Sequence, residues 1–262
     1  MSSRPIWYEL MTPDPGEVAP FYSATLGWNI QGIGTETASG HPYWMIGRND
    51  GGFAGGCILL TPEMQMSGGT AAWIPYFHVK AVEGTVEKAK RLGAKVWMGP
   101  MQTPQGTMAM LGDPQGAAFY LMNPIPPEGQ PDAVSDVFKP NAPGHCWWNE
   151  LETTDEPAAT AFYTALFGWT AENSMPIGDK GNYRFIEHDG PLGAINPWLA
   201  DYMAVGWVPY FGVEDVQAAY SAAKANGGTI HQDIHEVPGG DQIFIAGDPA
   251  GATVGFVGKK GA

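Results

Sequence analysis

The chain has 262 residues, of which 44% are hydrophobic and 15% are charged, so it has the composition of a globular protein and room for two domains of common size. Its formal net charge of −14 argues against nucleic acid and anionic membrane surfaces as partners, because both repel an acidic protein. No apolar stretch approaches the roughly 18 residues of a spanning helix, and the start lacks the pattern of a secretion signal.

The first elements of the chain are legible from local signals. Residues 6–12 have the pattern of a strand, and Asp14 is placed to cap a helix that has Pro15 at its first position. An apolar stripe follows at helical spacing, and Gly27 is placed to end the helix in a left-handed turn. The pattern predicts a strand followed by an amphipathic helix.

A second strand and helix follow at 74–79 and from Val82 to Gly93. The two helices are followed by β-rich segments at 43–46, 53–60, 96–98, 108–111 and 117–121. The last two flank the sequence GDPQG, in which Asp113 suits the first position of a type I turn, so they are expected to form a hairpin.

The chain then repeats itself. The segment that begins WYELMTPD at Trp7 returns 141 residues later as WNELETTD at Trp148, and WIPYF at Trp73 returns as WVPYF at Trp207. A third match pairs GDPQG with GDPAG. Between the copies lies a stretch rich in proline and glycine. We therefore predict a first domain at 1–123, a linker at 124–143 and a second domain at 144–262.

The order of one strand, one helix and three further strands, used four times along the chain, resembles that of the vicinal oxygen chelate superfamily. This superfamily includes glyoxalase I, bleomycin-resistance proteins and extradiol dioxygenases. The helix signatures from Asp14 to Trp28 and from Asp155 to Trp169, with the two GDPxG hairpins, carry the resemblance. In its length and sequence motifs, the chain is similar to tandem proteins typified by a mycobacterial antigen. These proteins are often labelled hydroxylases. The resemblance implies an α+β fold of four βαβββ units in two tandem domains, each an open curved mixed sheet with helices on its convex side.

Strand alternation then sorts the side chains between the helix side and the concave side. In the first half the expected inward residues are Trp7, Glu9, Met11, Ile74, Tyr76, His78, Ala118 and Tyr120. In the second half they are Trp148, Glu150, Glu152, Val208, Tyr210, Gly212, Thr253 and Gly255. The remaining tryptophans, among them Trp44, Trp97 and Trp198, add candidate cavity walls, whereas Trp28 and Trp169 are expected to fill the core.

The resemblance also implies where a metal would bind, at inward positions of the first and last strands. Those positions hold Trp7, Ile74 and Tyr120 in the first half and Trp148, Val208 and Gly255 in the second, with Cys57 as a lone donor nearby. None of the six aligned side chains binds a divalent ion as His or carboxylate would. His231 and His235 lie in a segment bracketed by glycine and proline and are expected to be solvated. We predict no metal and no cofactor.

Glu9 and Glu150 are the candidate catalytic bases, because each is expected inside a cavity beside a tryptophan, where desolvation raises a carboxyl pKa. Their alternative role is to hydrogen-bond a neighbouring strand or Tyr76 or Tyr210. His78 and Tyr120 are candidate proton donors, and the second copy has Gly212 at the position that matches His78, which suggests a specialised first pocket. Further ligand contacts are expected from Trp7, Met11, Trp44, Tyr76, Trp148, Glu152 and Tyr210.

The expected protein binds a small aromatic or carbonyl-bearing molecule without a metal, and it either transfers protons as an isomerase, epimerase or lyase does or only sequesters the molecule. A metal-dependent glyoxalase or dioxygenase is the third possibility. With only two cysteines, Cys57 and Cys146, the composition fits a reducing compartment, and we expect a cytoplasmic protein. Its expected state is a monomer or a homodimer.

Overall fold

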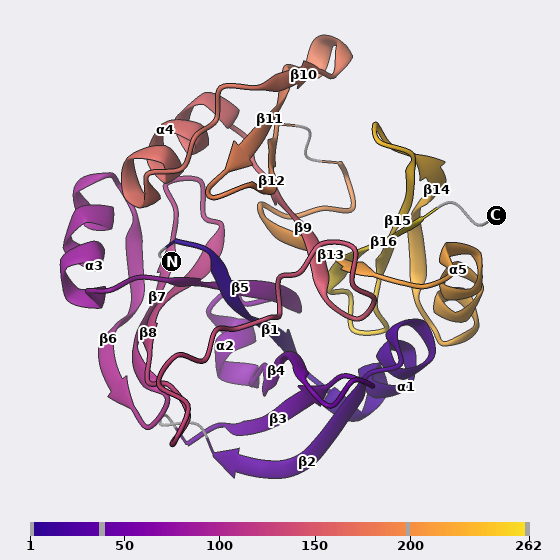
Figure 1. The fold of residues 1–262 in the computed structure, drawn as a ribbon, viewed down its shortest axis with the longest axis horizontal. Coiled ribbons are helices and arrows are strands. Elements are labelled where there is room, and N and C mark those ends of the chain that lie inside the picture. Colours follow the sequence, from indigo (N-terminus) through magenta and orange to yellow (C-terminus); the bar gives the residue numbers. More distant parts are fainter. Residues whose placement is uncertain (1–2, 37–39, 198–199, 260–262) are drawn as a thin grey trace. The chain divides into compact units, whose positions relative to one another are not determined.

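The computed structural model describes residues 3–36, 40–197 and 200–259, and it contains four βαβββ modules (Figure 1). The first module holds β1 (Pro5–Thr12), α1 (Pro15–Leu26), β2 (Asn29–Glu36), β3 (Pro42–Gly47) and β4 (Phe53–Leu59). The second holds β5 (Ala72–His78), α3 (Val82–Arg91), β6 (Lys95–Thr103), β7 (Gly106–Gly112) and β8 (Ala118–Pro124). The short helix α2 (Pro62–Met66) connects them.

The second half repeats the plan. Its first module holds β9 (Cys146–Glu152), α4 (Glu156–Phe167), β10 (Ser174–Pro176), the 3-10 helix η1 (Gly178–Lys180), β11 (Asn182–Glu187) and β12 (Pro191–Asn196). The last module holds β13 (Gly206–Gly212), α5 (Val216–Ala225), β14 (Thr229–Glu236), β15 (Asp241–Gly247) and β16 (Thr253–Lys259). The α+β class and the fourfold use of the βαβββ unit are confirmed. Strand β2 and helix α2 were not among the predicted segments.

Every module has the same strand pairing. The orders are β2-β3-β4-β1, β5-β8-β7-β6, β10-β11-β12-β9 and β13-β16-β15-β14. The opening strand runs parallel to the closing strand of its module, and the other pairs are antiparallel. Each tandem half therefore contributes eight strands of mixed pairing, as predicted.

By their internal contacts the residues fall into two compact units, and each unit takes segments from both tandem halves. The first unit comprises Met1–Ile6, Ile74–Asp136 and Trp148–Trp207, and the second comprises Trp7–Trp73, Val137–Trp147 and Val208–Ala262. The second unit thus combines α1 with α5, and the first combines α3 with α4. The domain and linker boundaries predicted from the repeat remain a prediction.

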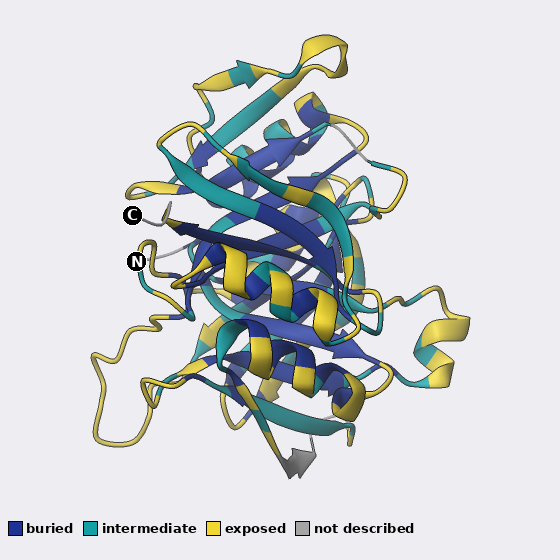
Figure 2. Ribbon diagram, turned by 90° about the vertical axis from the view of Figure 1, so that its right-hand side faces the viewer, coloured by how far each residue is buried: buried dark blue, intermediate teal, exposed yellow. Residues whose placement is uncertain are grey.

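The helices begin and end where the sequence signals indicate. The Asp14 carboxylate accepts hydrogen bonds from the backbone N–H groups of Gly16 and Glu17, at 2.8 and 3.2 Å, and Asp155 caps α4 in the same way through Ala158. Gly27 closes α1 with a left-handed φ of 67°. Helices α1, α3, α4 and α5 each bury one face and expose the other, and Figure 2 shows helices with dark blue and yellow sides.

Aromatic side chains make up much of the core between helices and strands. In the second unit the ring of Phe211 packs edge-on against Tyr8, Trp28 and Trp73, and Phe21 packs against Phe256. In the first unit Phe77, Phe119, Tyr163, Trp169 and Trp207 form the corresponding cluster. Trp28 and Trp169 are 1% and 4% exposed, so the prediction that they fill the core is confirmed.

A buried polar contact links the two sequence signatures inside each unit. The Tyr22 hydroxyl of α1 donates to Asp248 Oδ2 at 2.9 Å and accepts from Trp73 Nε1 at 2.9 Å. The Tyr163 hydroxyl of α4 likewise donates to Asp113 and accepts from Trp207. Each FY helix signature is therefore joined to the GDPxG turn of the other tandem half.

No helix in the described part of the chain is long and apolar enough to cross a membrane, which agrees with the expectation from the sequence.

Candidate functional site

One face of β9 carries the three side chains that the sequence analysis proposed as site residues of the second half. Trp148, Glu150 and Glu152 alternate along the strand and so share one face, because side chains of a strand repeat every second residue. Trp148 is half-buried, and Glu150 and Glu152 are 7% and 0% exposed. Two carboxyl groups are thus held out of water on neighbouring positions of one strand.

Tyr183 of β11 joins this face and was not predicted. Its hydroxyl accepts a hydrogen bond from Trp148 Nε1 at 2.8 Å and donates a short one to Glu150 Oε2. Burial and then the charge of Glu150 raise the pKa of Tyr183 well above its ordinary value, so the phenol keeps its proton. The result is a directed chain from indole to phenol to carboxylate.

Glu152 sits beside Glu150 in this cluster. One oxygen, Oε1, accepts from Asn196 Nδ2 of β12 at 3.3 Å, and the buried carboxyl group interacts with that of Glu150 on the same face. Burial first, and the charge of Glu150 second, raise the pKa of Glu152 far above that of an ordinary glutamic acid.

Tyr202 lies near the same pair, on the segment before β13. Its side chain is 39% exposed, and its pKa is raised by burial and then by the charges of Glu152 and Glu150. Unlike the two carboxyl groups, this phenol reaches solvent.

The first tandem half has part of this arrangement on β1, in the second unit. Trp7 Nε1 donates to the Tyr43 hydroxyl at 2.9 Å, and Tyr43 hydrogen-bonds Glu9, which is 2% exposed. The strand register is the same, but the residues then differ from those of the second half: Met11 and Ile58 are paired where β9 and β12 pair Glu152 and Asn196. The first half keeps the indole, phenol and carboxylate but lacks the second carboxyl group and its amide.

Tyr43 and Tyr183 are the functional residues that the sequence reasoning missed. A signal existed, because Tyr43 follows Trp7 by 36 residues and Tyr183 follows Trp148 by 35 residues. The partners predicted for the glutamates in a scaffold role were Tyr76 and Tyr210. The phenols of Tyr43 and Tyr183 come from β3 and β11, next but one to the opening strand in the order of each module, and the partnership with Tyr76 and Tyr210 stays a prediction.

The predicted residues of the second module gather on one face of β5–β8, in the first unit. The rings of Tyr76 and Tyr120 stack in parallel at 4.0 Å between centroids. His78, half-buried, is paired with Met122. The pairing of β6 with β7 and of β7 with β8 places five half-buried methionines on the same face as these residues. They are Met98, Met101, Met108, Met110 and Met122. This methionine–tyrosine face lies opposite Phe77, Phe119 and Leu121, which are buried.

Other predicted ligand contacts are placed as follows. Tyr210 is buried, and a side chain at the paired position 255 would meet its ring at 2.3 Å, so Gly255 makes room for it. Trp44 is paired with Cys57, which is paired with Leu10, so the register does not bring Trp44 to the face of Trp7 and Glu9. Trp198 lies outside the described residues.

The positions at which the superfamily would hold a metal do not offer a suitable donor set. Trp7 and Trp148 donate their indole N–H groups to tyrosines, and an N–H that points at an acceptor leaves no lone pair for a cation. Ile74 and Val208 are apolar, Tyr120 is stacked, and Gly255 has no side chain. In the described ranges, no group of three or more His, Cys, Asp or Glu side chains with metal-binding spacing occurs on β1, β8, β9 or β16.

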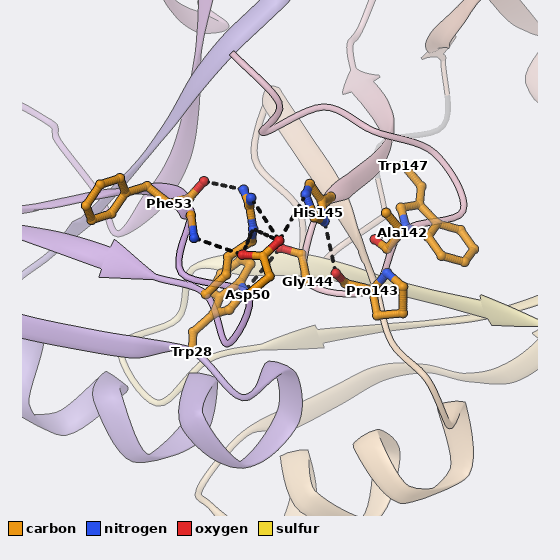
Figure 3. A network of polar contacts seen from close by, with 10 residues as sticks. Trp28, Asp50, Phe53, Ala142, Pro143, Gly144, His145 and Trp147 are labelled. Carbon is orange, nitrogen blue, oxygen red and sulfur yellow. Dashed lines mark hydrogen bonds and ion pairs between the residues drawn. The ribbon is translucent and has the colours of Figure 1, made fainter. Parts of the chain in front are cut away.

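A cleft of about 510 Å³ in the second unit lies away from all these residues. It is bordered by the end of α1, the β3–β4 turn, Pro143–Gly144 and the start of α5. The guanidinium of Arg48, on the wall of this cleft, donates two hydrogen bonds of 3.1 Å to the carboxylate of Asp50 and another to Phe53 O (Figure 3). The Arg48 guanidinium lowers the pKa of Asp50.

The segment that precedes β9 is tied to the same turn. His145 Nε2 lies 3.7 Å from Asp50, its Nδ1 donates to Pro143 O at 2.9 Å, and Trp28 Nε1 donates to Gly144 O at 3.1 Å (Figure 3). Since these polar groups bind protein atoms, we read the cluster as a brace for residues 142–147 and not as a ligand site.

Comparison with known proteins agrees with this fold. The model of the Glyoxalase/Bleomycin resistance protein/Dioxygenase superfamily matches residues 4–121 and 148–256, and the chain belongs to that superfamily. The expectation drawn from the helix signatures and the GDPxG hairpins is thereby confirmed.

Relatives of similar length are also found. The anthracycline biosynthesis protein DauV of Streptomyces sp. (strain C5) is 27% identical over 273 residues, which cover 97% of this chain and 92% of the relative. CFP32 of Mycobacterium tuberculosis (strain CDC 1551 / Oshkosh) is 30% identical over 113 residues, or 42% of this chain and 43% of the relative. Among solved structures, the Mn(II)-bound glyoxalase from Novosphingobium aromaticivorans superposes with a TM-score of 0.66 at 14% identity, over 98% of this chain and 82% of that one.

Proposed function

We propose that the protein binds a small planar aromatic or carbonyl-bearing molecule and transfers a proton on it, with Glu150 as the base and without a metal. The observation that carries this proposal is the buried chain from Trp148 through Tyr183 to Glu150. A carboxylate held in a desolvated aromatic wall is suited to take a proton from a carbon or oxygen acid. The bond to hydrogen breaks, the proton goes to Glu150, and the electron pair stays on the ligand.

The relatives support the choice of ligand class. DauV is named for anthracycline biosynthesis, and anthracyclines contain fused aromatic rings and carbonyl groups. Indole and phenol side chains such as Trp148, Tyr183 and Tyr202 stack well on such rings. We therefore take hydroxylated anthraquinones as first probes.

The test compares Glu150→Gln with Glu9→Gln, which changes the matching carboxyl of the first half. Binding is followed by quenching of tryptophan fluorescence, and proton transfer by deuterium exchange into the probe, observed by NMR. We expect Glu150→Gln to abolish deuterium exchange with little change in affinity, and we expect Glu9→Gln to retain most of the exchange. Equal exchange in wild type and Glu150→Gln would refute the assignment of the base.

A second candidate function is binding or sequestration without catalysis, and the methionine–tyrosine face of β5–β8 favours it. Methionine is flexible and polarizable, and it contacts aromatic rings favourably at about 0.3–1.5 kcal/mol each. The observation that separates the two functions is ligand binding without any proton exchange, combined with loss of affinity on Met108→Ala or Met110→Ala.

The third candidate is a metal-dependent glyoxalase or dioxygenase, as the superfamily's name and the Mn(II)-bound glyoxalase suggest. The residues at the corresponding positions of this chain do not fit a metal, so no step is derived through one. Elemental analysis of the purified protein, before and after incubation with Mn(II), Fe(II), Ni(II) and Zn(II), tests this point. A stoichiometric ion that is lost in Trp148→Ala or Tyr120→Phe would overturn the metal-independent proposal.

The expected homodimer or monomer and the expected cytoplasmic location are part of the same proposal. Gel filtration and cell fractionation test them directly.

A further inference from the structure

The two tandem halves differ at one point of chemistry, and the difference lies beside the proposed base. Along β9 and β12 the register pairs Glu152 with Asn196, whereas β1 and β4 pair Met11 with Ile58 at the same place. Both halves otherwise carry the tryptophan, tyrosine and glutamate of the site. A second buried carboxyl group has been added to only one of two similar frameworks.

Glu150 and Glu152 are both buried on one face of β9, where two negative charges would repel each other, so one shared proton relieves this repulsion. Carboxylate oxygens are acceptors, and two acceptors form a hydrogen bond only when one of them is protonated. Glu152 is 0% exposed, and its Oε2 meets no donor among the residues that the structure describes. Asn196 reaches only Oε1, at 3.3 Å, and the hydroxyl of Tyr183 already donates to Glu150.

We propose that Glu152 keeps a proton at neutral pH and donates it to Glu150 in a hydrogen bond, and that this pair makes the second tandem half the reactive one while the first only binds. This inference rests on the proposed function and names Glu152 as a positioning residue for its base. The groups that face the pair are Tyr183 of β11, Asn196 of β12 and Tyr202 of the segment before β13. Burial and the neighbouring charge both raise the pKa of Glu152, which supports the assignment.

The arrangement has a chemical consequence for Glu150. With donors on two sides, from Tyr183 and from Glu152, this carboxylate is held in one orientation on the wall of the site. When Glu150 takes a proton from a ligand, the hydrogen bond from Glu152 weakens, and the protonated pair must release one proton before the next cycle. Only the second half can turn over in this way, since Met11 offers no proton.

The first experiment is infrared difference spectroscopy of the full chain at pH 8, without any ligand. The carbonyl stretch of a protonated buried carboxyl should be present in wild type and in Glu9→Gln and lost in Glu152→Gln. At this pH Asp248, a buried acid whose pKa burial raises to about 6, is ionised. No difference between wild type and Glu152→Gln in this band would overturn the proposal.

The second experiment compares Glu152→Gln with Glu152→Met in the deuterium-exchange assay. The glutamine amide still donates to Glu150, so exchange should stay within threefold of wild type. Methionine copies the first half and should reduce exchange at least tenfold and shift its pH profile, while fluorescence quenching by the anthraquinone stays the same. Equal rates for Gln and Met would refute the positioning role.

The two experiments separate this inference from the proposed function. If wild type shows no exchange with any probe, the proposed proton transfer fails, and the infrared result still decides whether Glu152 holds the proton. If exchange occurs but depends on Glu9 and not on Glu150, the assignment of the reactive half is wrong.

Discussion

Tyr22→Phe removes a single buried hydroxyl and should destabilise the second unit measurably. That hydroxyl donates to Asp248 Oδ2 and accepts from Trp73 Nε1, each at 2.9 Å, and Tyr22 is fully buried. Phenylalanine fills nearly the same volume, so the loss is almost entirely polar. A buried group that loses its partner costs about 1–3 kcal/mol, and two groups are affected, which gives about 2–6 kcal/mol.

Tyr163→Phe is the matched control, because Tyr163 makes the equivalent contacts in the first unit. Its distances are longer, 3.1 Å to Asp113 and 3.3 Å to Trp207, so we expect a smaller loss of about 1–3 kcal/mol. Urea unfolding at pH 8, followed by circular dichroism and by tryptophan fluorescence, measures both losses. Values within about 0.5 kcal/mol of wild type for both variants would refute the reasoning, since ordinary surface changes fall in that range.

Three further changes test other parts of the structure. Burial raises the pKa of Asp248 to about 6, from about 3.9 in the unfolded chain, so this group contributes most to stability at low pH. About 3 kcal/mol of that contribution is lost as the pH rises from 4 to 6. Asp248→Asn should therefore flatten this part of the pH–stability curve measured by urea unfolding. Gly193→Ala would place a Cβ 1.8 Å from the backbone oxygen of Asn149 and should lower the free energy of unfolding by about 1–3 kcal/mol or more, whereas Gly99→Ala, with no atom within 4 Å, should have little effect. Asp14→Ala removes the N-cap of α1 and should cost about 1 kcal/mol in thermal or urea unfolding, with Asp155→Ala as its counterpart in α4; no loss in either would contradict the capping role.

The site could be predicted only where it follows from position along a strand. The alternation of β9 identified Trp148, Glu150 and Glu152 as neighbours on one face, and the structure places them so. The role of Tyr183 could not be derived in this way, because β11 reaches β9 only through β12 and the register across two strands is not written in local sequence. The same holds for Asn196, which faces Glu152 across one strand pair.

The partner of each buried aspartate is the clearest case of a tertiary decision. The motifs suggest that the FY helix and the GDPxG turn of one half belong together, yet Tyr22 bonds Asp248 and Tyr163 bonds Asp113. Either pairing of tyrosine with aspartate would leave the sequence and the local structure unchanged. Only the packing of whole modules determines which aspartate each tyrosine bonds.

The amino-acid sequence by itself determined the internal repeat, the helix ends and the faces of the opening strands, because caps, turns and periodicity act over a few residues, whereas the fourfold βαβββ plan followed from the resemblance to the superfamily. Only the tertiary structure decided which modules share a core, and it alone gave Glu152 the amide of Asn196 and Glu150 the hydroxyl of Tyr183. Those contacts depend on strand register and on the loss of water, and both are properties of the folded chain.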